Sequence, residues 1–446
     1  MKNILLFGAG KSTRSLIDYL LEFSQAEGHK FTVVDIDIPP DVLGVIRARQ
    51  GEFLQADIHD DEGRSALVEQ SDIVVSMLPA SLHILLARDC LTHKKHLVTA
   101  SYVSDEMRAL TDEAERKGLL FLNECGLDPG IDHMSAMKVI DRLREQSLEL
   151  TAFETFTGGL LAPDVNSDNP WEYKFTWNPR NVVLAGQGVV KFIQEGKYKY
   201  IPYNRIFRRT EQIFIPGFGH FEGYANRDSL KYLDLYGLRG IRTLFRGTLR
   251  RPGFCRTWDI FVKLGATDDT YLMEGVSNMS HREFINSFLQ YNPRDSIELK
   301  LAHYLGLDMD GPEMDRLRWT GFFEDEPVGL TKGTPAQVLE HILKKRWMLS
   351  HEEKDMIVMW HKFNYIKENV LHEIHSTMAV TGDNGDHTAM AKTVGLPVGI
   401  AVKLILNGLV NIRGVKIPIY KELYNPILEE LSKLGFIVTE KEVEKP

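Results

Sequence analysis

Residues 4–13 read ILLFGAGKST, and this stretch decides the fold class. The first five letters, ILLFG, form a short apolar run before glycine, which predicts a buried strand. The letters that follow fit two phosphate-binding motifs. Read as GK[ST], they suggest a P-loop for a nucleoside triphosphate; read as GxG after a strand, they suggest a dinucleotide fold.

The two motifs differ in where they need glycine. A P-loop, GxxxxGK[ST], would place its first glycine at Leu5, inside the predicted strand, so the loop that cradles the phosphates would be missing. The dinucleotide motif fits Gly8 and Gly10, with Thr13 in place of the third glycine, and an amphipathic helix over 12–23 follows. The sequence therefore favours a dinucleotide fold.

Strand and helix patterns alternate outward from this motif to about residue 128. Further strands are expected at 31–37, 72–79, 96–101 and 119–124, and helices at 41–50, 81–91 and 105–118. Such alternation predicts an α/β fold with a parallel sheet covered by helices on both faces. In these sheets ligands bind outside the carboxyl ends of the strands.

An acidic residue, Asp35, ends the second predicted strand. A carboxylate there can accept hydrogen bonds from both ribose hydroxyls of NAD and would repel the 2′-phosphate of NADP. No arginine follows directly to pair such a phosphate. The alternative is a solvated acid at a strand end. We therefore expect NAD as the cofactor, with NADP as the other choice.

Composition narrows the class of function. The chain has 446 residues, enough for two or three domains, and its formal net charge of −9 argues against a nucleic-acid partner. We expect no signal peptide and no membrane span; the last segments instead predict two helices split by Pro397. Cys90, Cys125 and Cys255 are far apart and show no disulfide or metal spacing. A cytoplasmic location is expected.

A near match to a zinc motif, HEIHS at 372–376, also needs an interpretation. The metalloprotease pattern HExxH requires a second histidine where this chain has Ser376. We therefore expect no metal.

Three segments follow predicted strands at one edge of the sheet, namely 75–79, 99–103 and 123–133. Their position is expected to bring Tyr102 and Asp128 to the nicotinamide end of the cofactor. Composition alone leaves Asp128 equally consistent with a turn residue, and Tyr102 with a half-buried ring.

Two later segments, YANRDS (224–229) and FRGTLRRPGF (245–254), carry arginines among glycines and aromatic residues. Arginine in such loops suits bidentate recognition of carboxylates. Surface salt bridging is the alternative, and the sequence leaves the two about even.

Longer motifs are found over nearly the whole chain. They are TASYVS, NECGLDPGIDHMSAMKVID, TGGLLAPDVNSDNPWEYKFTW, GYANRDSLKY, RGTLR, EEKDMIVM and AMAKTVGLPVGIAVKLILNG. With these motifs the chain resembles the glutamate-forming saccharopine dehydrogenases, also called saccharopine reductases. The similarity is greatest to the dehydrogenase half of the bifunctional lysine-degrading enzyme of animals and plants.

The resemblance implies an architecture and an activity. A Rossmann-like domain at 1–128 would be completed by about 388–446, an α/β substrate and dimerisation domain would comprise 129–270 and about 355–387, and 271–354 would form a helical insert. It implies a homodimer that uses NAD or NADP. The implied oxidoreductase activity is cleavage of saccharopine to L-glutamate and 2-aminoadipate 6-semialdehyde, or the reverse, in lysine metabolism.

The resemblance also implies site residues, carried over position by position. The family's saccharopine-contacting segments match Ser101, Tyr102, Asp128, Arg227, Thr248, Leu249 and Arg250. Its cofactor-contacting segments match Gly8, Ala9, Gly10, Lys11, Ser12, Asp35, Asp57, Ile58, Ser76, Met77 and Leu78. For the catalytic proton transfers we expect Asp128 first and Tyr102 second.

Three rival functions are open, of which the first two share the dinucleotide fold. One is a related reductive-amination synthase such as carboxynorspermidine synthase, whose product has fewer carboxylates, so the arginine segments count against it. Another is a non-catalytic dinucleotide-sensing protein, which would be expected to lose Asp128 or the arginine segments. The third is a P-loop kinase, and binding of ATP would support that alternative.

Overall fold

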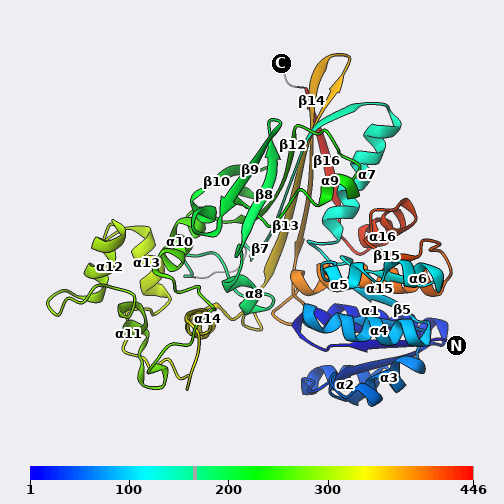
Figure 1. Cartoon of the computed structure of the whole chain (residues 1–446), viewed down its shortest axis with the longest axis horizontal. Coiled ribbons are helices and arrows are strands. Elements are labelled where there is room, and N and C mark those ends of the chain that lie inside the picture. The colour runs from blue at the N-terminus through cyan, green and yellow to red at the C-terminus, as the bar shows by residue number, and fades with distance from the viewer. Residues whose placement is uncertain (164–167, 445–446) are drawn as a thin grey trace. The chain divides into compact units, whose positions relative to one another are not determined.

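The computed structural model describes residues 1–163 and 168–444, so part of the quoted motif at 157–177 lies outside the described residues. The chain forms two compact units (Figure 1). Unit 1 comprises Met1–Glu149 and Met378–Thr439, and unit 2 comprises Leu150–Thr377 and Glu440–Pro446. The three-part division expected from the family stays a prediction.

Unit 1 is built on a seven-stranded sheet with the order β15-β6-β5-β4-β1-β2-β3, and its neighbours pair in parallel. The strands are β1 (Asn3–Phe7), β2 (Lys30–Asp35), β3 (Glu52–Gln55), β4 (Ile73–Ser76), β5 (His96–Thr99), β6 (Leu120–Leu122) and β15 (Gly414–Lys416). The order reverses at β1, which pairs with both β2 and β4. This switch point is where such sheets bind ligands, and the predicted Rossmann-like α/β fold is confirmed.

Helices from both ends of the chain cover this sheet. They are η1 (Lys11–Thr13), α1 (Arg14–Glu27), α2 (Pro40–Ala48), α3 (Asp61–Glu69), η2 (Ala80–Leu82), α4 (His83–His93), α5 (Asp105–Arg108), α6 (Thr111–Arg116), α7 (Ile131–Glu145), α15 (Ala389–Leu406) and α16 (Lys421–Lys433). Figure 1 shows α15 and α16, coloured orange to red, among the blue and cyan helices of the first 149 residues. α7 belongs to unit 1, where Tyr424 of α16 donates a hydrogen bond to Asp141 (2.8 Å).

The helix α15 corrects one expectation. It is continuous, so the predicted split at Pro397 is wrong, and it is long and apolar enough to cross a membrane, with a mean hydropathy of 1.6. However, 67% of this stretch is buried inside the protein. Gly395 lies so close to α1 that a methyl group there would meet the Cβ atom of Leu16 at 2.9 Å. Such burial and close packing are typical of a core helix.

Unit 2 contains most of a second sheet, whose strands follow the order β10-β11-β12-β7-β13-β14-β16, with β8 pairing β12 and β9. The strands are β7 (Glu149–Leu161), β8 (Val189–Gln194), β9 (Lys197–Pro202), β10 (Thr210–Ile215), β11 (Gly219–Ala225), β12 (Thr243–Arg250), β13 (Asp355–Lys367), β14 (Val370–Thr381) and β16 (Val438–Glu444). The helices are α8 (Pro179–Val183), η3 (Tyr203–Arg208), α9 (Tyr232–Leu235), α10 (Phe254–Leu264), η4 (Val276–Asn278), α11 (His281–Asn286), α12 (Ile297–Leu305), α13 (Pro312–Trp319) and α14 (Pro335–Trp347).

The HEIHS segment lies on β14 and not on a helix. Residues three apart on a strand face opposite sides of the sheet, so His372 and His375 do not face a common ion. His375 instead contacts Glu373, with 2.6 Å between Nε2 and Oε1. Within residues 1–163 and 168–444, no group of three His, Cys, Asp or Glu side chains is placed to hold a metal.

Candidate active site

The two glycines of the loop after β1 have different roles. The fold requires a glycine at Gly8, whereas Gly10 borders open space. Gly8 has φ +104°, and a Cβ atom on it would approach the carbonyl oxygen of Met77 to 2.9 Å. At Gly10 a Cβ atom would meet nothing within 4 Å. The helical turn η1 starts next to this space, and neither Gly10 nor Thr13 makes a side-chain cap. A helix start beside open space suits a pyrophosphate, so the loop fits the phosphates of a dinucleotide.

Alanine substitutions at these two glycines are expected to have different effects. Gly10→Ala should leave the melting temperature unchanged but weaken NADH binding about 10-fold, because its methyl group projects into the open space. Gly8→Ala should lower the melting temperature by several degrees, because the strained φ and the contact with Met77 cost about 1–2 kcal/mol or more. Thermal unfolding and NADH fluorescence titration measure both. Equal losses of stability in Gly8→Ala and Gly10→Ala would contradict the assignment of Gly8 to the fold and Gly10 to the cofactor site.

Asp35 connects the end of β2 to this loop. Its Oδ2 atom accepts a hydrogen bond from the N–H of Ala9 (2.6 Å), and its Oδ1 atom accepts one from the N–H of Ile36 (2.7 Å). The carboxylate is therefore held in a fixed position beside the loop, and Asp37 adds an exposed acid two residues later. Lys11 is exposed in the same loop.

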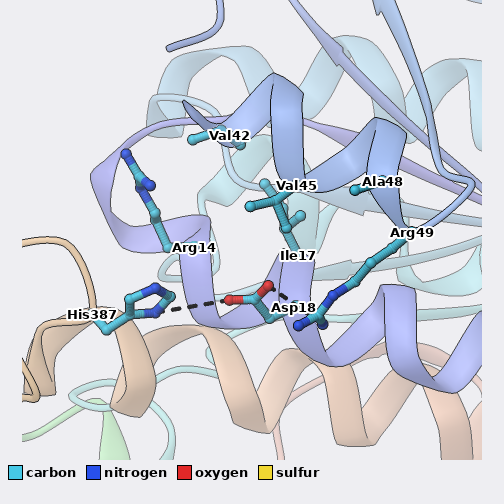
Figure 2. Close-up of a pocket in the computed structure, with 8 residues that line it drawn as sticks. All are labelled: Arg14, Ile17, Asp18, Val42, Val45, Ala48, Arg49 and His387. Atoms are coloured by element: carbon cyan, nitrogen blue, oxygen red, sulfur yellow. Dashed lines mark ion pairs between the residues drawn. The ribbon is translucent and has the colours of Figure 1, made fainter. Parts of the chain in front are cut away.

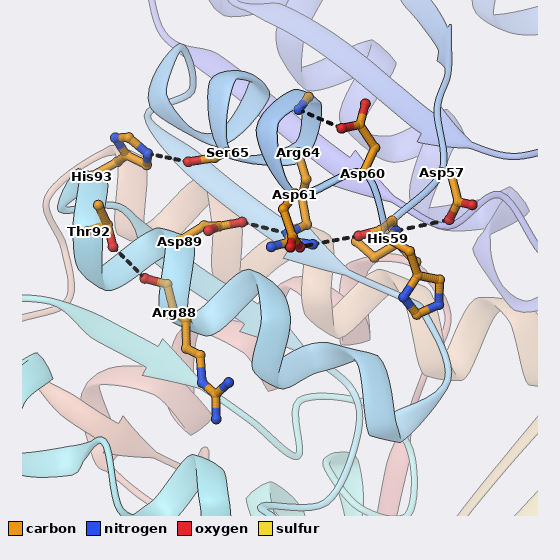
Figure 3. A network of polar contacts seen from close by, with 12 residues as sticks. Asp57, His59, Asp60, Asp61, Arg64, Ser65, Arg88, Asp89, Thr92 and His93 are labelled. Carbon is orange, nitrogen blue, oxygen red and sulfur yellow. Dashed lines mark hydrogen bonds and ion pairs between the residues drawn. The ribbon is translucent and has the colours of Figure 1, made fainter.

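The loop after β3 carries the predicted cofactor residues Asp57 and Ile58, and a buried arginine supports it (Figure 3). Arg64 donates to the carbonyl oxygen of Ile58 (2.6 Å) and to the carboxylate of Asp89 on α4 (2.6 Å). Asp57 accepts a hydrogen bond from the N–H of His59 (2.9 Å). Sequence reasoning missed Arg64, whose role here is to hold this loop in place.

A buried histidine, His83, bridges the ends of β4 and β5. Its Nδ1 atom lies 2.7 Å from the hydroxyl oxygen of Ser76, and its Nε2 atom lies 2.7 Å from that of Ser101. Thr99 approaches Nε2 at 3.4 Å. Burial lowers the pKa of His83 to about 4. Sequence reasoning missed this residue, although it joins two predicted contact residues.

The loop after β6 brings the two predicted catalytic residues together. The hydroxyl of Tyr102 donates to Oδ1 of Asp128 at 3.3 Å, and both side chains are partly exposed. Glu124 supports this arrangement from within, because it accepts a hydrogen bond from the N–H of Val103 (3.1 Å) and contacts Nε2 of His133 at 2.9 Å. Asp128 lies in a turn, as its local composition allowed, and the same turn brings its carboxylate to Tyr102; its catalytic role stays a prediction.

Cys125 lies fully buried beside these residues. Its thiol contacts the carbonyl oxygen of Pro397 at 3.6 Å, and burial raises its pKa. The thiol therefore stays protonated, as expected for a cysteine that packs in the core.

Four predicted substrate residues belong to unit 2, and Arg250 stands out among them. Its side chain is only 6% exposed and lies over the rings of Tyr173 and Phe254, with 4.8 Å and 5.1 Å from Cζ to the ring centroids. Its NH1 group donates to the carbonyl of Leu249 (2.9 Å), whereas its Nε atom has no hydrogen-bond partner. Among the described residues no carboxylate forms an ion pair with it. A buried cation without a counter-ion is costly, so this arrangement points to an anion-binding site.

The register of β12 places the other predicted residues. Thr248 lies opposite Thr157 of β7, on the same face of the sheet as Arg250, and the Oγ1 atom of Thr157 is buried without a hydrogen-bond partner. Sequence reasoning missed Thr157. The side chain of Leu249 points to the other face, so only its backbone can share a ligand with Arg250. Arg227 is exposed after β11 with φ +55°.

A cavity of about 380 Å³ lies between α1 and α2 (Figure 2). Its charged residues already pair: Asp18 lies 3.6 Å from Arg49 and 3.8 Å from His387, and Arg14 pairs with Asp41. None of the predicted contact residues lines it.

Comparisons with known proteins now decide the family. Residues 4–122 match the "Saccharopine dehydrogenase NADP binding domain" and residues 126–436 match the "Saccharopine dehydrogenase C-terminal domain". The chain belongs to the saccharopine dehydrogenase family. The resemblance stated from the motifs is thereby confirmed, as is dinucleotide binding by the N-terminal domain.

Individual relatives match nearly the whole chain, but the chain spans different shares of their lengths. The mitochondrial alpha-aminoadipic semialdehyde synthase of Rattus norvegicus is 32% identical over 98% of this chain, which spans about half (47%) of that protein. The saccharopine dehydrogenase [NADP(+), L-glutamate-forming] of Schizosaccharomyces pombe is 30% identical over 100% of both chains. The apo structure of the L-Glu-forming saccharopine dehydrogenase of Saccharomyces cerevisiae superposes with a TM-score of 0.88, at 30% identity, over 99% of this chain and 100% of that one.

Proposed function

We propose that this chain catalyses the NAD-dependent oxidative cleavage of saccharopine to L-glutamate and 2-aminoadipate 6-semialdehyde, or the reverse condensation. The observation that carries the proposal is Arg250, a buried cation without a carboxylate partner in the described structure. Saccharopine has three carboxylates, and family members are named for its cleavage. A carboxylate of the substrate would supply the missing charge.

The reaction consumes saccharopine, NAD⁺ and water and yields glutamate, the semialdehyde, NADH and a proton. Bound NAD supplies the acceptor for the hydride that leaves the methylene carbon next to the secondary amine. That carbon cannot release a hydride while the amine is protonated, so a group of the protein must take the proton. Water then adds to the imine, and the carbinolamine collapses to the two products.

The resemblance assigns named residues to these steps. Asp128 is the proposed proton acceptor and Tyr102, which donates to it at 3.3 Å, is the second acid–base group. Arg250 and Thr248 are proposed to bind one carboxylate, and Arg227 another. Fixing the substrate in this way can supply several kcal/mol of the barrier reduction.

The choice of NAD over NADP is part of the proposal. Three fungal relatives carry NADP(+) in their names, and the matching domain is described as NADP binding. In this chain, however, the carboxylate of Asp35 is fixed at the end of β2 and Asp37 follows it. Two acids at this position oppose a 2′-phosphate by charge repulsion. Homodimer formation and a cytoplasmic location also stay predictions.

An absorbance assay at the NADH band tests the proposed function directly. Purified protein with saccharopine and NAD is expected to form NADH together with equal amounts of glutamate and semialdehyde. The rate with NADP should be at least about 10-fold lower in kcat/KM. Carboxynorspermidine, tested under the same conditions, should give no NADH. Absence of a saccharopine-dependent signal with either cofactor would refute the proposal.

A further inference from the structure

The two hydroxyls that contact His83 differ in exposure. Ser76 is fully buried at the end of β4, whereas Ser101 is partly exposed two residues after the end of β5. Each hydroxyl oxygen lies 2.7 Å from a different ring nitrogen. Of the two, only Ser101 has a side chain that a ligand can reach.

The imidazole ring of His83 links the hydrogen-bond roles of these two hydroxyls. A neutral imidazole donates from one nitrogen and accepts at the other, and burial keeps His83 neutral at physiological pH. When the Ser76 hydroxyl donates to Nδ1, the Nε2–H group must donate to Ser101. The hydrogen of the Ser101 hydroxyl is then turned away from the ring. The opposite tautomer would turn that hydrogen inward, toward Nε2.

We propose that His83 is a positioning residue that holds the Ser101 hydroxyl as an outward hydrogen-bond donor to a carboxylate of the substrate. This role rests on the proposed function, whose substrate carries carboxylates. An ionised carboxylate only accepts hydrogen bonds, so it needs a donor such as the Ser101 hydroxyl. Ser76 anchors the tautomer from the buried side. Thr99 fixes the backbone of Ser101, because its hydroxyl accepts from the N–H of Ser101 at 3.3 Å.

Two amide substitutions test the contacts at Nδ1 and at Nε2 of His83 separately. The side-chain amide of His83→Asn can reach the position of Nδ1 but not that of Nε2, and that of His83→Gln can reach the position of Nε2. H83N and Ser101→Ala are each expected to raise the KM for saccharopine about 10-fold, whereas H83Q should stay within about 3-fold of wild type. KM for NAD and kcat should change little in all three, and H83N and H83Q should lower the melting temperature by similar amounts, because both replace a buried ring with a smaller side chain.

A double variant provides the stricter test. If His83 acts through Ser101, H83N combined with S101A should raise the KM for saccharopine no further than S101A alone. Equal effects of H83N and H83Q, or multiplied effects in the double variant, would overturn the proposal. A histidine with only a structural role would lower the melting temperature without separating the two amide variants.

A third variant keeps the proposal testable if H83N does not fold. Ser76→Ala removes the anchor at Nδ1 and should raise the KM for saccharopine about 3-fold at saturating NAD, but not in the H83Q background. An unchanged KM in S76A would then contradict the role of His83. If wild-type protein oxidises no saccharopine, the proposed function and this role both fail; if it does and the variants behave alike, only this role fails.

Discussion

Replacing Arg250 with methionine is expected to lower kcat/KM for saccharopine about 100-fold or more and, at the same time, to raise the melting temperature of the ligand-free protein. The loss of activity follows from removing the guanidinium proposed to bind a substrate carboxylate. The gain in stability follows because this cation is buried without a counter-ion, and an apolar side chain of similar length removes that cost. A rise of about 1–3 °C is expected.

Two control variants accompany R250M: one replaces a nearby exposed arginine, and the other keeps the charge at position 250. Arg242 lies next to β12, is exposed and pairs with Glu195 at 2.9 Å, so Arg242→Met should change neither quantity. Arg250→Lys keeps the charge but loses the planar fork, and we expect about a 10-fold loss of kcat/KM. Steady-state kinetics and thermal unfolding measure both effects, and NADH titration should give the wild-type Kd. A lower melting temperature in R250M would show that contacts within the protein already offset the cost of burying the Arg250 guanidinium.

Replacing Asp35 with asparagine is expected to shift the ratio of kcat/KM for NAD to that for NADP by about 10- to 100-fold toward NADP. The substitution removes the negative charge that opposes a 2′-phosphate. It keeps an amide oxygen that can still accept the hydrogen bond from the N–H of Ala9, which is 2.6 Å from Oδ2 in the native chain. The charge effect is thereby separated from the support of the loop.

Two further variants complete the cofactor experiment. Asp35→Ala removes both the charge and the acceptor, so it should weaken binding of both cofactors in addition to shifting the ratio. Asp37→Asn, at the exposed neighbouring acid, should shift the ratio less than D35N. A ratio that stays constant in D35N would show that this carboxylate does not set the cofactor choice.

Much of unit 1 could be predicted from the sequence because its signals are local. Five of its seven strands are short apolar runs followed by helices at regular intervals, so the alternation indicates the parallel sheet. The other two, β3 (EFLQ) and β15 (GVK), lack such a run and were not expected. The pairing of Tyr102 with Asp128 also follows from strand order, since both segments follow neighbouring strands. The long helix α15 was missed because proline usually interrupts helices, and the packing of Gly395 against α1 cannot be seen locally.

The missed residues depend on contacts between distant parts of the chain. His83 and Ser101 are 18 positions apart, and nothing near His83 shows that its ring reaches two strand ends. The lack of a counter-ion at Arg250 becomes visible only when every neighbour is known. The orientation of Leu249, by contrast, could have been predicted, since alternation along a strand already separates it from Thr248 and Arg250.

The discontinuity of unit 1 has a consequence for its synthesis. Its edge strand β15 begins at Gly414 and pairs with β6, whereas the first segment of the unit ends at Glu149. Roughly 270 residues therefore leave the ribosome between these two parts, which takes roughly 15–50 s at ordinary elongation rates. During that interval the surface of α1 around Leu16, later covered by Gly395, has no cover from α15. The nascent chain thus passes through a stage in which holding chaperones would find an apolar helix face to bind.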